Sequence, residues 1–179
     1  MNGLFTVAGL PGHPLLVDAV AVLLPLAAVC SVGLAVHRGV RRRFGWPVLV
    51  LTAVGVLAVP LAEATGDQLR SHLPAPDPLL ARHEAQGALL LPYALGFGVA
   101  VLLLVVAGKL ADRERAATNR SELPDTAPDT DRAGAVSTLW RRTSVLASVL
   151  VIGMSVVTTV DVVRIGTTGA QAVWQGVAH

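Results

Sequence analysis

Two histidines stand at the start of two long apolar stretches, and imidazole is a side chain well suited to bind a metal-centred cofactor. His13 precedes one apolar run, and His83 precedes another about seventy residues later. Two imidazoles at one depth on facing helices are suitable axial ligands for a b-type haem. Arg82 and Arg164 lie at the corresponding ends of their own segments and are candidate partners for the haem propionates. One interpretation is therefore a haem b protein that transfers electrons.

Carboxylates near the same ends allow a second interpretation. Asp18 and Glu63, together with His13 and His83, form a candidate site for a divalent metal ion or a proton, because imidazole combined with carboxylate suits zinc, copper or iron. In the haem interpretation, the same carboxylates would fix the imidazole tautomers. No pair of histidines four residues apart supports a metal site.

The third interpretation is non-catalytic, and it is the one the sequence favours. Histidine at a membrane boundary commonly forms hydrogen bonds at a helix end, so these groups would hold helix ends and loops together. We predict no catalytic residue, because the chain has neither a phosphate-binding Gly-Lys loop nor a nucleophile elbow. On this interpretation the chain is a structural or accessory subunit, with a respiratory or other membrane complex, or a second copy of itself, as its partner.

Composition identifies the elements that must position these groups. The 179 residues are 53% hydrophobic and only 15% charged, far more apolar than an ordinary soluble domain. Charge-poor runs predict four transmembrane helices, because each is long enough to cross the hydrocarbon core. We therefore expect an all-α, integral membrane four-helix bundle in one domain, 1–179. The expected helices are 14–36, 46–65, 83–108 and 142–164, with a disordered cytoplasmic linker at about 112–135.

The distribution of cations predicts how the helices are oriented. Eleven of the 14 Lys and Arg residues lie between the first and second spans or between the third and fourth. Cytoplasmic loops are enriched in such residues, so both termini are expected on the extracytoplasmic side of a bacterial-type plasma membrane, N-out and C-out. Nucleic acid is not an expected partner, because the net charge is only +2 and the basic residues are where membrane topology requires them.

With this topology, ionisable groups gather at the outer ends of the helices. A polar cluster is expected there, in which Asp161 and Arg164 form the most favourable internal pair because they are three residues apart on one helix. The members of this expected cluster are His13, Asp18, Glu63, His83, Asp161 and Arg164. No internal repeat is visible in the sequence.

Motifs at three places carry a resemblance to a known family. They are the segment 9–18 with Pro25, His83 with Gly87, and the segment 163–174. With these motifs, the chain resembles a family of small four-helix bacterial membrane proteins of unknown function, some fused to Rieske-type iron-sulfur domains. The helix plan is similar to that of b-type cytochromes, and the resemblance implies a redox role. One departure is Thr167, where the family pattern leads us to expect histidine.

Overall fold

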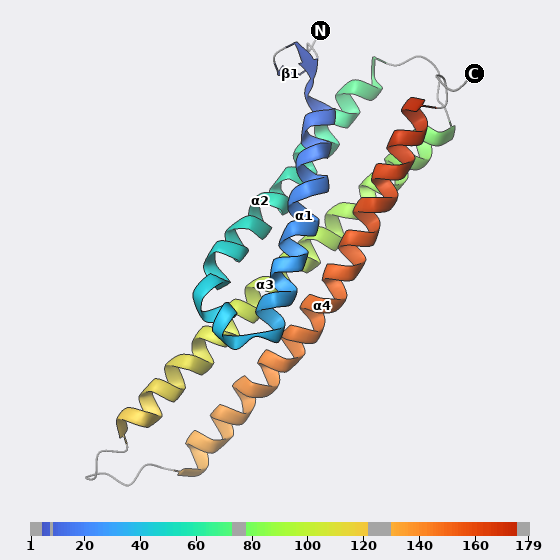
Figure 1. Ribbon diagram of the computed structural model, residues 1–179. Helices are drawn as coiled ribbons and strands as arrows, with labels where there is room; N and C mark the ends of the chain where they lie inside the picture. The colour runs from blue at the N-terminus through green and yellow to red at the C-terminus, as the bar shows by residue number, and fades with distance from the viewer. Residues whose placement is uncertain (1–4, 8, 73–77, 122–129, 175–179) are drawn as a thin grey trace.

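Four long helices make up nearly all of the computed structural model, which describes residues 5–7, 9–72, 78–121 and 130–174 (Figure 1). All four are long and apolar enough to cross a membrane, which confirms the all-α, four-helix prediction. The helices are α1 (Gly12–Val36), α2 (Arg38–Arg70), α3 (Pro78–Ser121) and α4 (Thr130–Trp174), and a short hairpin of β1 (Thr6–Val7) and β2 (Leu10–Pro11) precedes them.

The helices are longer than the hydrophobic pattern predicts. Helix α2 begins directly after His37 rather than at residue 46, because the intervening arginines are good helix formers. Residues 112–121 and 130–135, expected in a disordered linker, belong to α3 and α4 in the structure. The first of these stretches is rich in Ala, Arg and Glu, which favour helix outside the membrane as well as inside it. Residues 122–129 of the expected linker lie outside the described part of the chain.

Each helix packs against two neighbours. Helix α1 contacts α2 and α4 extensively, helix α3 contacts the same two helices, and α1 and α3 face each other diagonally across the bundle. Helices α1 and α3 run in the same direction, and α4 ends at the end of the bundle where α1 begins (Figure 1). We call this end the histidine end, because His13 lies in the first turn of α1 and His83 in the second turn of α3.

The two hairpins α1–α2 and α3–α4 bury equivalent positions. Five buried residues of α1 each have a buried counterpart 70 positions later in α3. In order, Val20, Leu24, Ala27, Ser31 and Leu34 correspond to Leu90, Ala94, Phe97, Val101 and Leu104. In the same way, Val48, Thr52 and Val59 of α2 correspond to Val151, Ser155 and Val162 of α4, each 103 positions later. The halves are therefore related by an approximate two-fold rotation about the bundle axis, a repeat that residue identity alone does not reveal.

The β-hairpin fixes the entry of the chain into α1. Gly9 adopts a φ of +82°, a conformation that residues with a Cβ rarely adopt. The backbone N–H of Gly12 donates to Phe5 O at 2.8 Å, and a Cβ at Gly12 would collide with the Phe5 ring. These contacts set the start of α1, one residue before His13.

Candidate functional site

His13 crosses from α1 to α2 at the histidine end. Its Nδ1–H donates to the backbone carbonyl of Ala62 at 2.9 Å. The ring lies over Gly66, one turn further along α2, where a Cβ would be only 3.0 Å from His13 Cε1. The hydrogen bond and the absent side chain together fix the position of the ring and leave Nε2 as its free nitrogen.

His83 makes the same contacts in the second half of the chain. Its Nδ1–H donates to the carbonyl of Ile165 on α4 at 3.1 Å, and a Cβ at Gly169 would lie 3.0 Å from His83 Cε1. Ala62 and Ile165, like Gly66 and Gly169, are 103 positions apart, the spacing that relates α2 to α4. The two histidines are therefore equivalent members of one symmetric site.

The two imidazole rings lie close together in an edge-on arrangement. Their centroids are 6.5 Å apart and their planes are inclined at 82°. Two imidazoles that bind opposite sides of one metal ion through bonds of about 2.0 Å have ring centres roughly 6 Å apart. Metal-binding histidines typically donate their second ring N–H to a carbonyl or carboxylate, as both rings do here. The separation of the ring centres is therefore close to that of a bis-imidazole centre, and each ring has its second nitrogen bonded as such ligands do.

Threonine hydroxyls bond to carbonyls of the helix turns that carry the two glycines. Thr65 donates its hydroxyl to Leu61 O or Ala62 O, and Thr168 does the same one repeat later with Arg164 O and Ile165 O. Thr168 also lies 2.9 Å from Gln86 Oε1, which joins α4 to α3. The sequence Thr-Gly thus marks the same position in both halves.

Below the rings, the bundle has an apolar core with polar atoms embedded at its edge. Val20, Leu24, Val59, Leu90 and Val162 form part of this core, which Ala62 and Ile165 extend toward the histidines. Glu63 Oε1, Asp161 Oδ2 and Thr158 Oγ1 are buried and have no hydrogen-bond partner among the described residues. Buried polar atoms normally have partners, so each of these three atoms is a point where a further polar group would be favourable.

The predicted carboxylate ligands are not assembled around the histidines. Asp18 is exposed, and Glu63 and Asp161 are each only partly buried. The described part of the chain contains no group of three or more His, Cys, Asp or Glu side chains placed to hold a metal ion. Backbone carbonyls, and not Asp18 or Glu63, orient the two imidazoles.

Arg82 and Arg164 line a polar groove between α3 and α4, with a volume of about 460 Å³. The expected ion pair between Asp161 and Arg164 is not among the ion pairs of the described residues, because Arg164 extends to the exposed groove while Asp161 Oδ2 is buried. The ion pair at this end is instead formed by Arg70 Nε and Glu84 Oε1, at 2.8 Å, and it links the end of α2 to the start of α3.

The sequence pattern missed the residues that hold the histidines. The acceptors belong to the backbone, which no side-chain pattern identifies, and a glycine in a membrane helix has many other uses. One signal was available, the Thr-Gly pair that occurs at Thr65-Gly66 and again at Thr168-Gly169. Each pair lies about one turn after the acceptor residue, and each follows a helix that has a histidine near its start.

The fold and this site define a four-helix membrane protein with a symmetric pair of histidines at one end of its bundle. The family described as "Predicted membrane protein (DUF2231)" matches residues 9–127, which include His13, His83 and the first three helices. The chain belongs to this family. No curated protein and no solved structure matches the chain.

Proposed function

We propose that this protein is a membrane electron carrier in which His13 and His83 would hold a b-type haem through their imidazole nitrogens. The observation that carries the proposal is the 6.5 Å separation of two imidazoles whose Nδ1 atoms are already bound to helix carbonyls. This arrangement leaves one nitrogen on each ring for the iron. The family assignment supplies membrane location but no activity.

The chain's own residues would bind and orient the haem. The carbonyls of Ala62 and Ile165 select the tautomer that presents Nε2, and hydrogen bonds of this kind raise the basicity of the ligand nitrogen. Arg82 and Arg164 bring two positive charges to the groove beside His83, where they would pair with propionate carboxylates. When bound, a haem with two protein ligands supplies one-electron oxidation and reduction.

We also propose that the histidine end faces the outside of a bacterial plasma membrane, so that both termini are extracytoplasmic. The support is the positive charge at the opposite end of the bundle, where residues 38–43 and 109–115 hold seven cations and two acids. Cys30 is the only cysteine, so a Cys30→Ser background allows single cysteines to be placed at either end. We expect an impermeant maleimide to label intact cells that carry the His72→Cys variant, and not cells that carry the Gly39→Cys variant.

An accessory structural role is the second candidate, and one observation favours it. The bonds from His13 to α2 and from His83 to α4 tie two pairs of helix ends together without any cofactor. In that case the chain would serve a respiratory or other membrane complex, or form a homo-oligomer, and the histidines would contribute only to stability.

Absorption spectra of the detergent-purified protein, oxidised and then reduced with dithionite, distinguish the two candidates. Expression with added haem precursor removes haem supply as a variable. The proposal expects a stoichiometric b-type spectrum that is lost in His13→Ala and in His83→Ala. His72→Ala is the matched control, because His72 lies at the same end but bonds only within its own neighbourhood, to Gln68 O and Ser71 Oγ.

Two results would overturn the haem assignment. One is a folded wild-type protein that contains no haem after supplementation and does not bind added haemin. The other is a haem spectrum that survives both substitutions. A colourless protein in which both substitutions lower the unfolding temperature would establish the structural role.

A further inference from the structure

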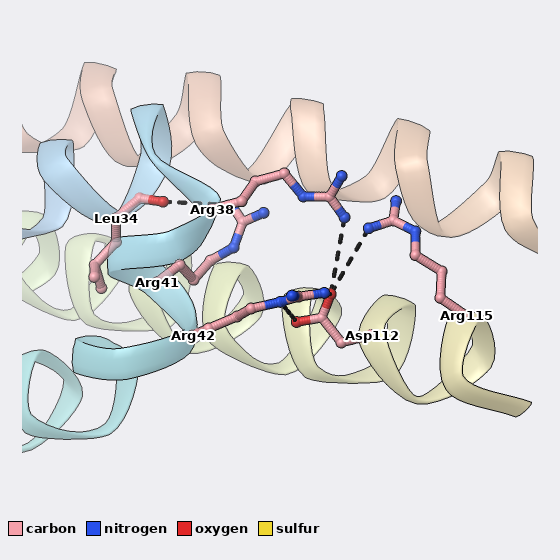
Figure 2. Close-up of polar contacts among 6 residues, drawn as sticks. All are labelled: Leu34, Arg38, Arg41, Arg42, Asp112 and Arg115. Carbon is pink, nitrogen blue, oxygen red and sulfur yellow. Dashed lines mark hydrogen bonds and ion pairs between the residues drawn. The ribbon is translucent and has the colours of Figure 1, made fainter. Parts of the chain in front are cut away.

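Three arginines converge on one carboxylate at the end of the bundle opposite the histidines (Figure 2). Arg42 of α2 donates to both carboxylate oxygens of Asp112 on α3, each at 2.7 Å. Arg38 and Arg115 each lie within 4 Å of Asp112 Oδ1, at 3.8 and 3.7 Å. The three guanidinium groups remain about half exposed, at 44 to 59% of the side chain. We call Arg38, Arg42, Arg115 and Asp112 the arginine cluster.

A neighbouring arginine has a separate structural role. Arg41 donates from Nη1 to Leu34 O, one of the last carbonyls of α1, at 3.4 Å. Its side chain crosses Gly108 of α3, where a Cβ would be 2.8 Å from Arg41 Nε. Arg41 therefore joins three helices, as Figure 2 shows for its contact with α1, and we leave it out of the cluster.

The positive charge of Arg38, a member of the cluster, and of Arg41 beside it is unfavourable at the start of α2. Arg38 and Arg41 lie in the first turn of α2, which contains no acid and has no side-chain cap. The start of a helix carries partial positive charge and exposed N–H groups, so it favours anions and disfavours cations. Among the ion pairs of the described residues, one carboxylate is shared by three guanidinium groups, so these contacts carry a net positive charge that an external anion would offset.

Aromatic side chains indicate where this anion comes from. Phe44 and Trp46 are 46% and 62% exposed on α2, just beyond the arginines. Arg43 lies over the Phe44 ring and Lys109 over the Trp46 ring, at 5.6 and 5.4 Å. Exposed aromatic rings next to basic groups at the end of a span are typical of lipid headgroup depth. The cluster is therefore at the level of membrane phosphates.

We propose that the arginine cluster binds the phosphate headgroup of an anionic phospholipid. The lipid phosphate adds the negative charge that Asp112 alone does not provide, and its acyl chains lie along the exposed apolar surface of α2. This site is at the far end of the bundle from the histidines and does not depend on what they bind.

Quenching of Trp46 fluorescence by lipids with brominated chains tests the proposal. A Trp140→Phe, Trp174→Phe background leaves Trp46 as the only tryptophan. The full chain is reconstituted into two kinds of vesicle, each containing both phosphatidylglycerol and phosphatidylcholine. In one kind only the phosphatidylglycerol is brominated, and in the other only the phosphatidylcholine is brominated. We expect phosphatidylglycerol to bind beside Trp46 about fivefold or more tightly than phosphatidylcholine, the effect of one basic group at an anionic surface.

Variants assign the effect to the cluster. Arg38→Gln, Arg42→Gln and Arg115→Gln combined should reduce the preference to near one, while Asp112→Asn should increase it. Arg43→Gln is the matched control, because Arg43 is equally basic but contacts Phe44 and is not paired with Asp112. Circular dichroism and size-exclusion profiles identify any variant that has not folded, and Asp112→Asn provides an increase that misfolding would not produce.

Each remaining outcome counts against the proposal. Equal quenching by both lipids in the parent protein overturns it, as does an equal loss of preference in the Arg43→Gln variant. Inorganic phosphate is added at millimolar concentration, with sodium chloride matched in ionic strength. If it abolishes the preference where chloride does not, the site binds soluble phosphate and the lipid assignment is wrong.

Discussion

A methyl group added beside either histidine should destabilise the bundle, and the two halves should respond alike. In Gly66→Ala, the new Cβ would lie 3.0 Å from His13 Cε1 and 3.2 Å from His13 Nδ1; in Gly169→Ala it would meet His83 at the same distances. Ordinary carbon contacts begin near 3.5 Å. Each imidazole ring is hydrogen-bonded to a carbonyl of the helix that carries the substituted glycine. The ring therefore cannot move away from the new methyl group without lengthening that hydrogen bond.

The size of the effect follows from two opposing contributions. Replacing glycine by alanine inside a helix stabilises it by about 0.5–1 kcal/mol. Overpacking by one methyl group costs about 1–3 kcal/mol where neighbours cannot relax. Gly33→Ala and Gly153→Ala provide the reference, because a Cβ at those positions meets nothing within 4 Å. We expect Gly66→Ala and Gly169→Ala each to be less stable than these controls by about 1–3 kcal/mol.

Reversible unfolding in mixed micelles, followed by circular dichroism as dodecyl sulfate is increased, measures these differences. Haemin binding by the same samples shows whether a substitution has also altered the histidine pair. The reasoning is refuted if Gly66→Ala and Gly169→Ala match Gly33→Ala in stability. It is also refuted if one of them is strongly destabilised and the other is not, because the structure gives both glycines the same contacts.

Three further predictions concern an ion pair, a backbone conformation and a hydroxyl contact at the histidine end. A double-mutant cycle with Arg70→Gln and Glu84→Gln should give a coupling of about 0.5 kcal/mol that falls with added salt, because the ion pair is partly exposed; a coupling that salt does not change would contradict this. Gly9→Ala should cost about 1 kcal/mol in the same unfolding assay, since φ is +82°, and Gly9→Asn should cost less. Thr168→Val removes the hydroxyl that contacts Gln86 and should cost about 1–2 kcal/mol, whereas an unchanged stability would show that water replaces this contact.

The sequence predicts the number of helices well, but it does not predict which way each helix faces. Length and hydropathy define the spans, and the same pattern places His13 and His83 at one end. In α1, however, Val22 and Val29 are exposed while Leu24 is buried. Residues that face lipid and residues that face protein are equally apolar, so the usual amphipathic signal is missing. Without that signal, the sequence wrongly placed Asp18 inside the bundle, whereas the structure exposes it.

The internal two-fold relation escaped sequence analysis for a related reason. Equivalent buried positions are occupied by different apolar residues, such as Ala27 and Phe97, because only the total volume of the core must be conserved between the halves. What the halves share is backbone geometry and a few special residues, the histidine and the Thr-Gly pair. Such sparse identity becomes visible only once the helices are superimposed in space.

The start of α1 and the end of α4 both lie at the histidine end, which determines what can be attached there (Figure 1). A domain or partner joined to either of these helix ends would lie within a few turns of the imidazole pair. The arginine cluster lies beyond the full length of α1, whose 25 residues correspond to about 37 Å. A module joined at either of these helix ends can therefore reach the histidines through a short connection. To reach the arginine cluster, it would need a connection about as long as α1.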